Sequence, residues 1–422
     1  MTTPIAYPAP TGSLRDIRLY MQNGCLSPRG AEILLRQDTL WQIVARHVQD
    51  PGWWREQSPA VSHPPELPWR IQSWDAALRL QVPGVDIWID PGPEAPIPAQ
   101  APNLIIVTHA HYDHTARLGD FSTAFPSARV VMSDNTYGLL SLQAQSDVQL
   151  RRCLEERTVR IELGAQRVIE GARLTLVPAG HLLGAAMIDV EVGDDAILVT
   201  GDFALRDVGG VPGAPWPEKR YSLVLIEATS VHRGALPVAD PQANRMPFLQ
   251  EVSSWLERGK TRILVTTQAM GQAQELYAAL VLSQQAGAFP DLKVRLTRFA
   301  EVVSKRYYDA LKESSRVWHC PFYTLEADRI PPQSVVISSE DEDSGLAQSL
   351  REVPDGECVT DPAVYTHAGW GERMTWAVGV PSHAVGLYAG YSSSLHTALS
   401  DIGRKVRALS QEGEEWLINE DQ

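Results

Sequence analysis

Three histidines and one aspartate fall within six positions of this chain, from His109 to His114. They directly follow the apolar run 104–107, which predicts a buried strand that ends in a polar turn. Alternate residues of an extended segment point to the same side, so the imidazoles of His109 and His111 can bind one ion. Nitrogen and oxygen donors of this kind suit zinc, and manganese can also use them. The clustering therefore predicts a metal site.

This segment resembles the HxHxDH signature of the metallo-β-lactamase fold superfamily. The resemblance implies an α/β fold, an αββα sandwich in which two sheets are flanked by helices. It also implies two metal positions, one bound by His109 and His111 and the other by Asp113 and His114.

The same resemblance implies two further ligands later in the chain. His181 lies in the glycine-flanked turn 178–184, which matches the third motif of the family. Asp202 follows the apolar run 196–199, where the family places an aspartate whose two oxygens bridge two ions. Asp90 ends another predicted strand, and we expect it to orient a ligand histidine without binding metal itself.

Three more segments resemble the β-CASP nucleases, a branch of that superfamily. The segment 224–230 resembles motif A with Glu227 as its acid, and 259–276 resembles the strand, turn and helix that open the β-CASP insert. The segment 391–397 resembles motif B, in which His396 would protonate the leaving oxygen of a phosphodiester while Glu227 holds it. The predicted catalytic residues are Asp113, Glu227 and His396, and the predicted substrate contacts are His232, Arg233, Ser392, Ser393 and Ser394. Five other histidines are expected to be structural or solvated: His47, His63, His319, His367 and His383.

Motif C is where the chain departs from the family. RNA-processing members end a strand there with a histidine, whereas this chain has Asn419 after the apolar residues 416–418. An amide carbonyl is a weaker ligand than an imidazole, so we expect zinc or manganese in one tight site and a weaker second site. Artemis-type DNA-repair nucleases also lack this histidine, which slightly favours DNA over RNA.

Composition limits the possible functions. The chain has 422 residues, of which 44% are hydrophobic, enough for a large core and two domains. No apolar run approaches the roughly 18 residues of a membrane span, so we expect a cytoplasmic protein. Its four cysteines form no CxxC pair. A net charge of −14 opposes binding to a polyanion, which predicts either a small substrate or a locally basic, metal-rich cleft.

The domain organisation follows from the motifs. Residues 1–66 are predicted to be an accessory segment, 67–234 the first part of the metallo-β-lactamase core, 235–375 the β-CASP insert and 376–422 the C-terminal return of the core. The accessory segment is either extra packing or an element that recruits a protein partner.

The predicted function is a metal-dependent nuclease that hydrolyses the phosphodiester bonds of nucleic acid. Two alternatives stay open. A small-molecule metallo-hydrolase of the same superfamily is favoured by the acidity, and a catalytically weakened nuclease-like subunit of a complex is suggested by Asn419.

Overall fold

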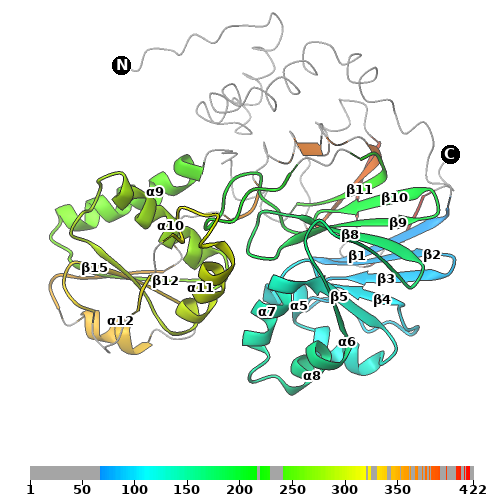
Figure 1. Ribbon diagram of the computed structural model, residues 1–422, viewed down its shortest axis with the longest axis horizontal. Coiled ribbons are helices and arrows are strands. Elements are labelled where there is room, and N and C mark those ends of the chain that lie inside the picture. Colours follow the sequence, from blue (N-terminus) through cyan, green and yellow to red (C-terminus); the bar gives the residue numbers. More distant parts are fainter. Residues whose placement is uncertain are drawn as a thin grey trace, which may run out of the picture.

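Short segments with alternating apolar residues form two seven-stranded sheets that face each other in the computed structural model, and a third sheet of five strands lies beside them (Figure 1). This arrangement confirms the α/β class and the sandwich of sheets. The structure describes residues 67–215, 219–228, 241–319, 322–324, 330–339, 344–351, 353–360, 362, 366–368, 373, 376–377, 380, 382–389, 396, 405–409, 413 and 415–418.

The first sheet has the strand order β19-β1-β2-β3-β4-β5-β6. From β3 to β6 the strands are parallel, so their carboxyl ends meet at one edge. Its strands are β1 (Trp69–Trp74), β2 (Ala77–Val82), β3 (Val85–Ile89), β4 (Leu104–Ile106), β5 (Arg129–Ser133), β6 (Thr158–Ile161) and β19 (Trp416–Ile418). The helices that follow β4 and β5 are α5 (Tyr112–Thr115), α6 (Leu118–Ala124), α7 (Asp134–Gln143) and α8 (Val148–Arg157).

The second sheet has the order β18-β17-β11-β10-β9-β8-β7. Strands β10, β11, β17 and β18 are parallel, and their carboxyl ends also share one edge. Its strands are β7 (Gln166–Ile169), β8 (Ala172–Pro178), β9 (Ala186–Val192), β10 (Asp195–Val199), β11 (Tyr221–Glu227), β17 (Ser382–Tyr388) and β18 (Lys405–Ala408).

Side-chain alternation explains why both faces of the first sheet are apolar. Ile87 and Leu104 belong to the cluster that fills the space between the two sheets. Their neighbours Trp88 and Ile105 point to the other side, into a second cluster with the helices. A parallel sheet that is covered on both faces needs this nearly continuous apolar sequence.

The third sheet, in the order β14-β13-β15-β12-β16, is parallel at every pairing that the structure describes. Its elements lie inside the range 235–375 predicted for the insert. The boundaries of the four predicted domains stay predictions, because residues 1–66 and 229–240 lie outside the described residues. The strands are β12 (Arg262–Thr267), β13 (Lys293–Leu296), β14 (Tyr323–Thr324), β15 (Ser334–Ser339) and β16 (Gly356–Thr360), and the helices are α9 (Pro241–Glu257), α10 (Gln272–Gln285), α11 (Arg298–Leu311) and α12 (Ser344–Arg351).

The third sheet and its helices dock on the sandwich through α10 and α11 (Figure 1). Helix α11 packs against α7, and the Tyr307 hydroxyl on α11 accepts a hydrogen bond of 3.0 Å from the Leu183 amide. The indole of Trp318 donates to the carbonyl of Gly209 at 2.7 Å. These contacts fix the insert against the loops that follow β8 and β10.

None of the helices in the described part of the chain is long and apolar enough to cross a bilayer. The cytoplasmic location stays a prediction.

Candidate metal centre

The candidate ligands lie at the edge where the parallel strands of both sheets end. His109 and His111 follow β4, His181 follows β8 and Asp202 follows β10. One nitrogen from each histidine and one oxygen of Asp202 all lie within 4.8 Å of one another. Thus the structure brings together four residues that are up to 93 positions apart in the sequence (202 minus 109).

The spacing of these donor atoms fits one tetrahedral ion. His111 Nδ1 lies 3.1 Å from the Nε2 atoms of both His109 and His181. Asp202 Oδ2 lies 3.6 Å from His109 Nε2 and 3.7 Å from His181 Nε2. Ligands held about 2.0–2.1 Å from zinc at tetrahedral angles are about 3.3 Å apart. The observed distances bracket that value, so the donor set fits zinc.

The other ring nitrogen of each of these three histidines faces an oxygen. Hydrogen bonding at that nitrogen fixes the tautomer and directs the lone pair of the opposite nitrogen into the cluster. The pairs are His109 Nδ1 with Thr108 Oγ1 at 3.0 Å, His111 Nε2 with the Met270 carbonyl at 3.1 Å and His181 Nδ1 with the Thr366 carbonyl at 3.0 Å.

Asp113 and His114 lie on the neighbouring side of Asp202. His114 Nε2 is 3.4 Å from Asp202 Oδ2 and 3.7 Å from Asp113 Oδ2. Asp90 accepts a 2.8 Å hydrogen bond from His114 Nδ1, and it also accepts from the amide and hydroxyl of Thr108. Asp90 thus contacts His114 and is not part of the described donor groups, and its role in orienting a ligand histidine stays a prediction.

Two glycines allow the ligand turns to pack closely. Gly180, before His181, has a φ of +72°, and a Cβ atom there would lie 2.4 Å from the Ala204 carbonyl oxygen. Gly201, before Asp202, has a φ of +54°, and a Cβ atom there would lie 2.9 Å from Thr108 Cβ. Larger residues would therefore push the ligands apart.

The electrostatics of the cluster are those of a cation site. Burial lowers the pKa of His109 and of His181 well below its usual value, which keeps both imidazoles neutral and able to bind metal. Burial opposes ionisation of Asp202, but the surrounding histidines, His367 first, hold its pKa well below the usual range. Burial also opposes protonation of His114, yet Asp202 and Asp90 raise its pKa well above the usual value. The carboxylates thus attract positive charge to this point.

Glu227, at the end of β11, lies completely buried beside the cluster. Burial raises the pKa of this carboxyl, but the guanidinium of Arg373 together with His367 outweighs burial and lowers it. Arg373 Nη2 donates a hydrogen bond to Glu227 Oε1, and Arg373 is itself completely buried. The carboxylate is therefore ionised inside the fold.

His367 is the residue that sequence reasoning missed. It was expected to be structural or solvated, but its Nδ1 lies 3.4 Å from Asp202 Oδ2 and 3.9 Å from Glu227 Oε1. The sequence carried one local signal, because Thr366-His367-Ala368 repeats the tripeptide Thr108-His109-Ala110.

The structure describes little of the predicted proton donor, the predicted substrate contacts and the motif C position. His396 is half-buried and is not a member of either described donor group. The predicted substrate contacts and the motif C position lie outside the described residues: His232, Arg233, Ser392, Ser393, Ser394 and Asn419.

The register of β19 bears on motif C. Strand β19 is antiparallel to β1, and Ile418 pairs with Trp69, at the end of β1 that is far from the ligand edge. Strand β18 is parallel to β17 and ends beside Leu387, at the ligand edge. The geometry therefore does not favour the assignment of motif C to the residue after β19.

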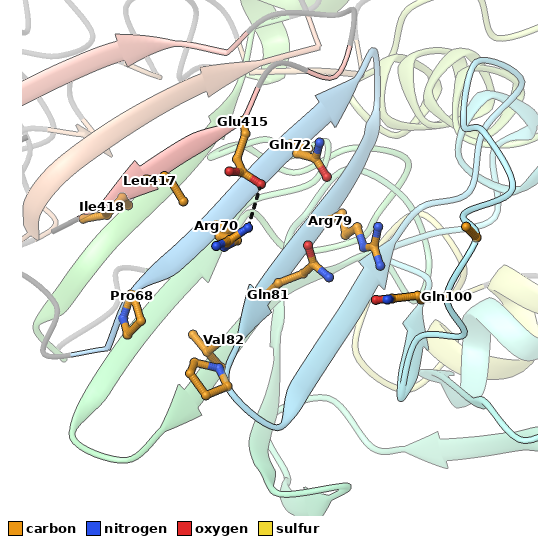
Figure 2. A pocket seen from close by; sticks show the side chains of 12 residues that line it. Pro68, Arg70, Gln72, Arg79, Gln81, Val82, Gln100, Glu415, Leu417 and Ile418 are labelled. Atoms are coloured by element: carbon orange, nitrogen blue, oxygen red, sulfur yellow. Dashed lines mark ion pairs between the residues drawn. The ribbon is translucent and has the colours of Figure 1, made fainter. Parts of the chain in front are cut away.

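A hollow on the outer face of β1 and β2 shares no residue with the cluster (Figure 2). Its two arginines already face carboxylates: Arg70 is 3.5 Å from Glu415, and Arg79 forms a two-pronged pair with Asp86. This neutralised surface gives no independent support for binding a polyanion.

Comparisons with known proteins agree with this geometry. A sequence profile of the metallo-beta-lactamase superfamily matches residues 87–241. The chain is similar to the cleavage and polyadenylation specificity factor subunit 3 of Dictyostelium discoideum, with 30% identity over 224 residues, which cover 48% of this chain and 28% of that protein. It is also similar to the endoribonuclease YSH1 of Yarrowia lipolytica, with 27% identity over 221 residues, 48% of this chain and 26% of that protein. The matched part thus spans less than a third of either relative.

A solved structure from Enterococcus faecalis V583, described as a protein of unknown function, superposes with a TM-score of 0.51 and 12% sequence identity. The match covers 83% of this chain and 100% of that chain. At this identity the likeness shows a shared fold only.

Proposed function

We propose that this chain, whose residues 87–241 match the metallo-beta-lactamase superfamily, hydrolyses the phosphodiester bonds of nucleic acid. The observation that carries the proposal is the convergence of His109, His111, His181 and Asp202 on one point, with the ionised Glu227 beside it. One of the relatives described above is named a cleavage and polyadenylation specificity factor subunit, and the other is named an endoribonuclease.

The proposed metal complement is one tight site and one weaker site. His109, His111, His181 and Asp202 would hold the tight site, and Asp113, His114 and Asp202 would contribute to the weaker one. The nitrogen-rich donor set favours zinc, and manganese is the second choice. Such ions supply positive charge for a phosphate and lower the pKa of water.

The side chains around the ligands have distinct proposed roles. Asp113, whose side chain is 56% exposed, faces the open side of the site and can approach a substrate. Glu227 stays ionised through Arg373 and provides fixed negative charge inside the wall of the site. His396 is the proposed proton donor to the leaving oxygen, because it occupies the histidine position of motif B.

The substrate class is nucleic acid, with RNA as the first choice. The slight preference for DNA rested on the absence of a motif C histidine, and the relatives lend it no support. The Yarrowia relative is named an endoribonuclease, which favours RNA. His232, Arg233, Ser392, Ser393 and Ser394 remain the proposed substrate contacts.

A net charge of −14 predicts weak and salt-sensitive binding to RNA or DNA. We therefore propose that a protein partner recruits the enzyme through residues 1–66. Deletion of this segment should preserve hydrolysis of a small phosphodiester and abolish association with the partner. Tight binding of nucleic acid by the intact protein at physiological salt would refute recruitment.

The decisive experiment is cleavage of end-labelled single- and double-stranded RNA and DNA with zinc, manganese or magnesium. Asp202→Asn should abolish cleavage, while Asp86→Asn, on the outer face of the first sheet, should leave it unchanged. Hydrolysis of a thioester or lactone without hydrolysis of a chromogenic phosphodiester would support the small-molecule alternative. If the unaltered protein binds its full complement of metal but hydrolyses none of these substrates, the alternative of a catalytically weakened subunit would be supported.

A further inference from the structure

His367 lies beside the donor cluster, although it comes from the segment between the third sheet and β17. Its Nδ1 forms a compact group with one oxygen each from Asp202 and Glu227, all within 4.8 Å. Its ring also lies against that of His181, with 4.4 Å between the ring centroids. The side chain is 24% exposed, so one side of the imidazole remains open to solvent.

The backbone around His367 is tied to the sandwich at three consecutive residues. The Thr366 carbonyl accepts from His181 Nδ1 at 3.0 Å, and the His367 carbonyl accepts from Arg206 Nη2 at 3.0 Å. The Ala368 amide donates to the Phe203 carbonyl at 2.5 Å. Two of these partners flank or include candidate ligands, so the position of the His367 imidazole is set by the same turns that set the metal site.

Two polar atoms in this group lack hydrogen-bond partners among the described residues. They are His367 Nδ1 and Asp202 Oδ1, and both are buried. Buried polar atoms without a partner are rare and costly in folded proteins. An ion beside Asp202 would give both atoms a partner. Glu227 has less need of one, because Arg373 already donates to it.

The C-terminal strands supply no competing histidine. Strand β18 ends at the ligand edge, and Gly413 is already hydrogen-bonded to the Ser73 carbonyl of β1. The sequence from 409 to 418 contains no histidine at all. This stretch of sequence therefore cannot supply the imidazole that Asp113, His114 and Asp202 would need to complete a four-ligand set.

We propose that His367, through Nδ1, is the histidine ligand of the second metal ion and substitutes for the imidazole that the C-terminal strands lack. The proposal deepens the proposed function and rests on it. It assigns the ligand to the segment between β16 and β17, so that the second site is completed only when this segment is docked on the core.

The first test measures metal stoichiometry at controlled concentrations of free zinc, using His367→Ala and His319→Ala. His319 is exposed and belongs to neither donor group, so it provides the matched control. In His367→Ala the first equivalent should bind as in the unaltered protein. The affinity for the second equivalent should fall further. Loss of an outer hydrogen-bonding partner typically lowers metal affinity by about 10- to 100-fold, and loss of a direct ligand should exceed that range. An unchanged second equivalent would overturn the proposal.

A second variant gives a positive signal that does not depend on loss of binding. His367→Cys, loaded with cobalt, should acquire the near-ultraviolet charge-transfer absorption of a cobalt–thiolate bond. His319→Cys should not acquire it. Absence of the band in a folded His367→Cys protein that holds two cobalt ions would refute direct ligation.

The outcomes separate this inference from the proposed function. Two bound ions with a cobalt–thiolate band but no cleavage of any nucleic acid would support the ligand and refute the nuclease. Full binding of two ions by His367→Ala together with lost cleavage would refute the ligand and show that His367 acts in substrate binding or in the reaction itself. Failure of the unaltered protein to bind even one ion would refute both.

Discussion

The imidazole of His111 is held by a backbone carbonyl of the insert: its Nε2 lies 3.1 Å from the oxygen of Met270. His111 follows β4 in the sandwich, whereas Met270 lies between β12 and α10. Thr366 makes the equivalent contact with His181. Two ligands of the tight site are therefore oriented by residues outside the sandwich, and correct docking of the insert should strengthen metal binding.

The pair Arg245–Glu275 tests this coupling. Arg245 on α9 donates two hydrogen bonds to Glu275 on α10, at 2.9 and 2.7 Å, and Glu275 accepts a third from the Gly209 amide of the sandwich. Arg245→Met strands a buried carboxylate and should lower the free energy of unfolding by about 3–5 kcal/mol. It should also weaken zinc binding. Denaturant titration and zinc titration measure the two effects.

A double variant provides the control for this prediction. Arg245→Met combined with Glu275→Gln removes the stranded charge while keeping an acceptor for the Gly209 amide, so it should recover part of the lost stability. If zinc affinity is unchanged in a destabilised Arg245→Met protein, docking of the insert and metal binding are independent.

Asp90 should matter for metal affinity through its contacts with His114 and Thr108. Asp90→Asn replaces one of the two accepting carboxyl oxygens with an amide nitrogen, which is a donor, and so disturbs the orientation of both residues. We expect metal affinity to fall by about 10- to 100-fold, as is usual for an outer partner of a ligand. Asp86→Asn, in the neighbouring strand β3, should bind metal normally. Equal zinc affinities for Asp90→Asn and the unaltered protein would contradict this role.

The metal ligands after β4 could be predicted because their spacing is local. His109, His111, Asp113 and His114 follow one apolar run, and a strand that ends there places them together whatever the rest of the chain does. The glycines around His181 similarly indicated a close turn. The sandwich itself followed from alternating apolar residues and from resemblance to a known family.

The parts that could not be predicted depend on long-range pairing. The Thr-His-Ala tripeptide alone does not distinguish His367 from a surface histidine, and only the docking of Thr366 and Ala368 on the sandwich places it beside Asp202. The motif C position is a second example. Strands β18 and β19 lie close together in the sequence, but they pair in different sheets. Only β18, which is parallel to β17, ends at the ligand edge, whereas β19 is antiparallel to β1 and ends far from it. The contact from Met270 is made by its backbone carbonyl, which every residue has, so the pattern of side chains in the sequence does not predict it.

Removal of metal should destabilise the sandwich. The cluster holds neutral imidazoles in contact and an ionised Asp202 in a buried site, and a ligand that binds the folded state at a hundredfold excess over its Kd stabilises it by about 2.7 kcal/mol. Thermal unfolding should occur at a lower temperature after chelation and return to the original temperature when zinc is restored. A melting temperature that is unaffected by chelation, with metal loss verified by elemental analysis, would mean that the cluster is stable without an ion.

His396 and His367 should respond differently to substitution, and this contrast tests the proposed proton donor. His396→Ala should retain both metal ions and lower the turnover of RNA by about 100-fold or more, the usual size of a general-acid contribution. A nitrophenyl phosphodiester needs little protonation of its leaving group, so its turnover should be nearly normal in the same variant. His367→Ala should instead lose the second ion and turn over both substrates poorly, because both substrates need that ion whatever their leaving group. Loss of metal from His396→Ala, or an equal loss of turnover with both substrates, would show that His396 is a ligand or a structural residue and that the proton comes from another group.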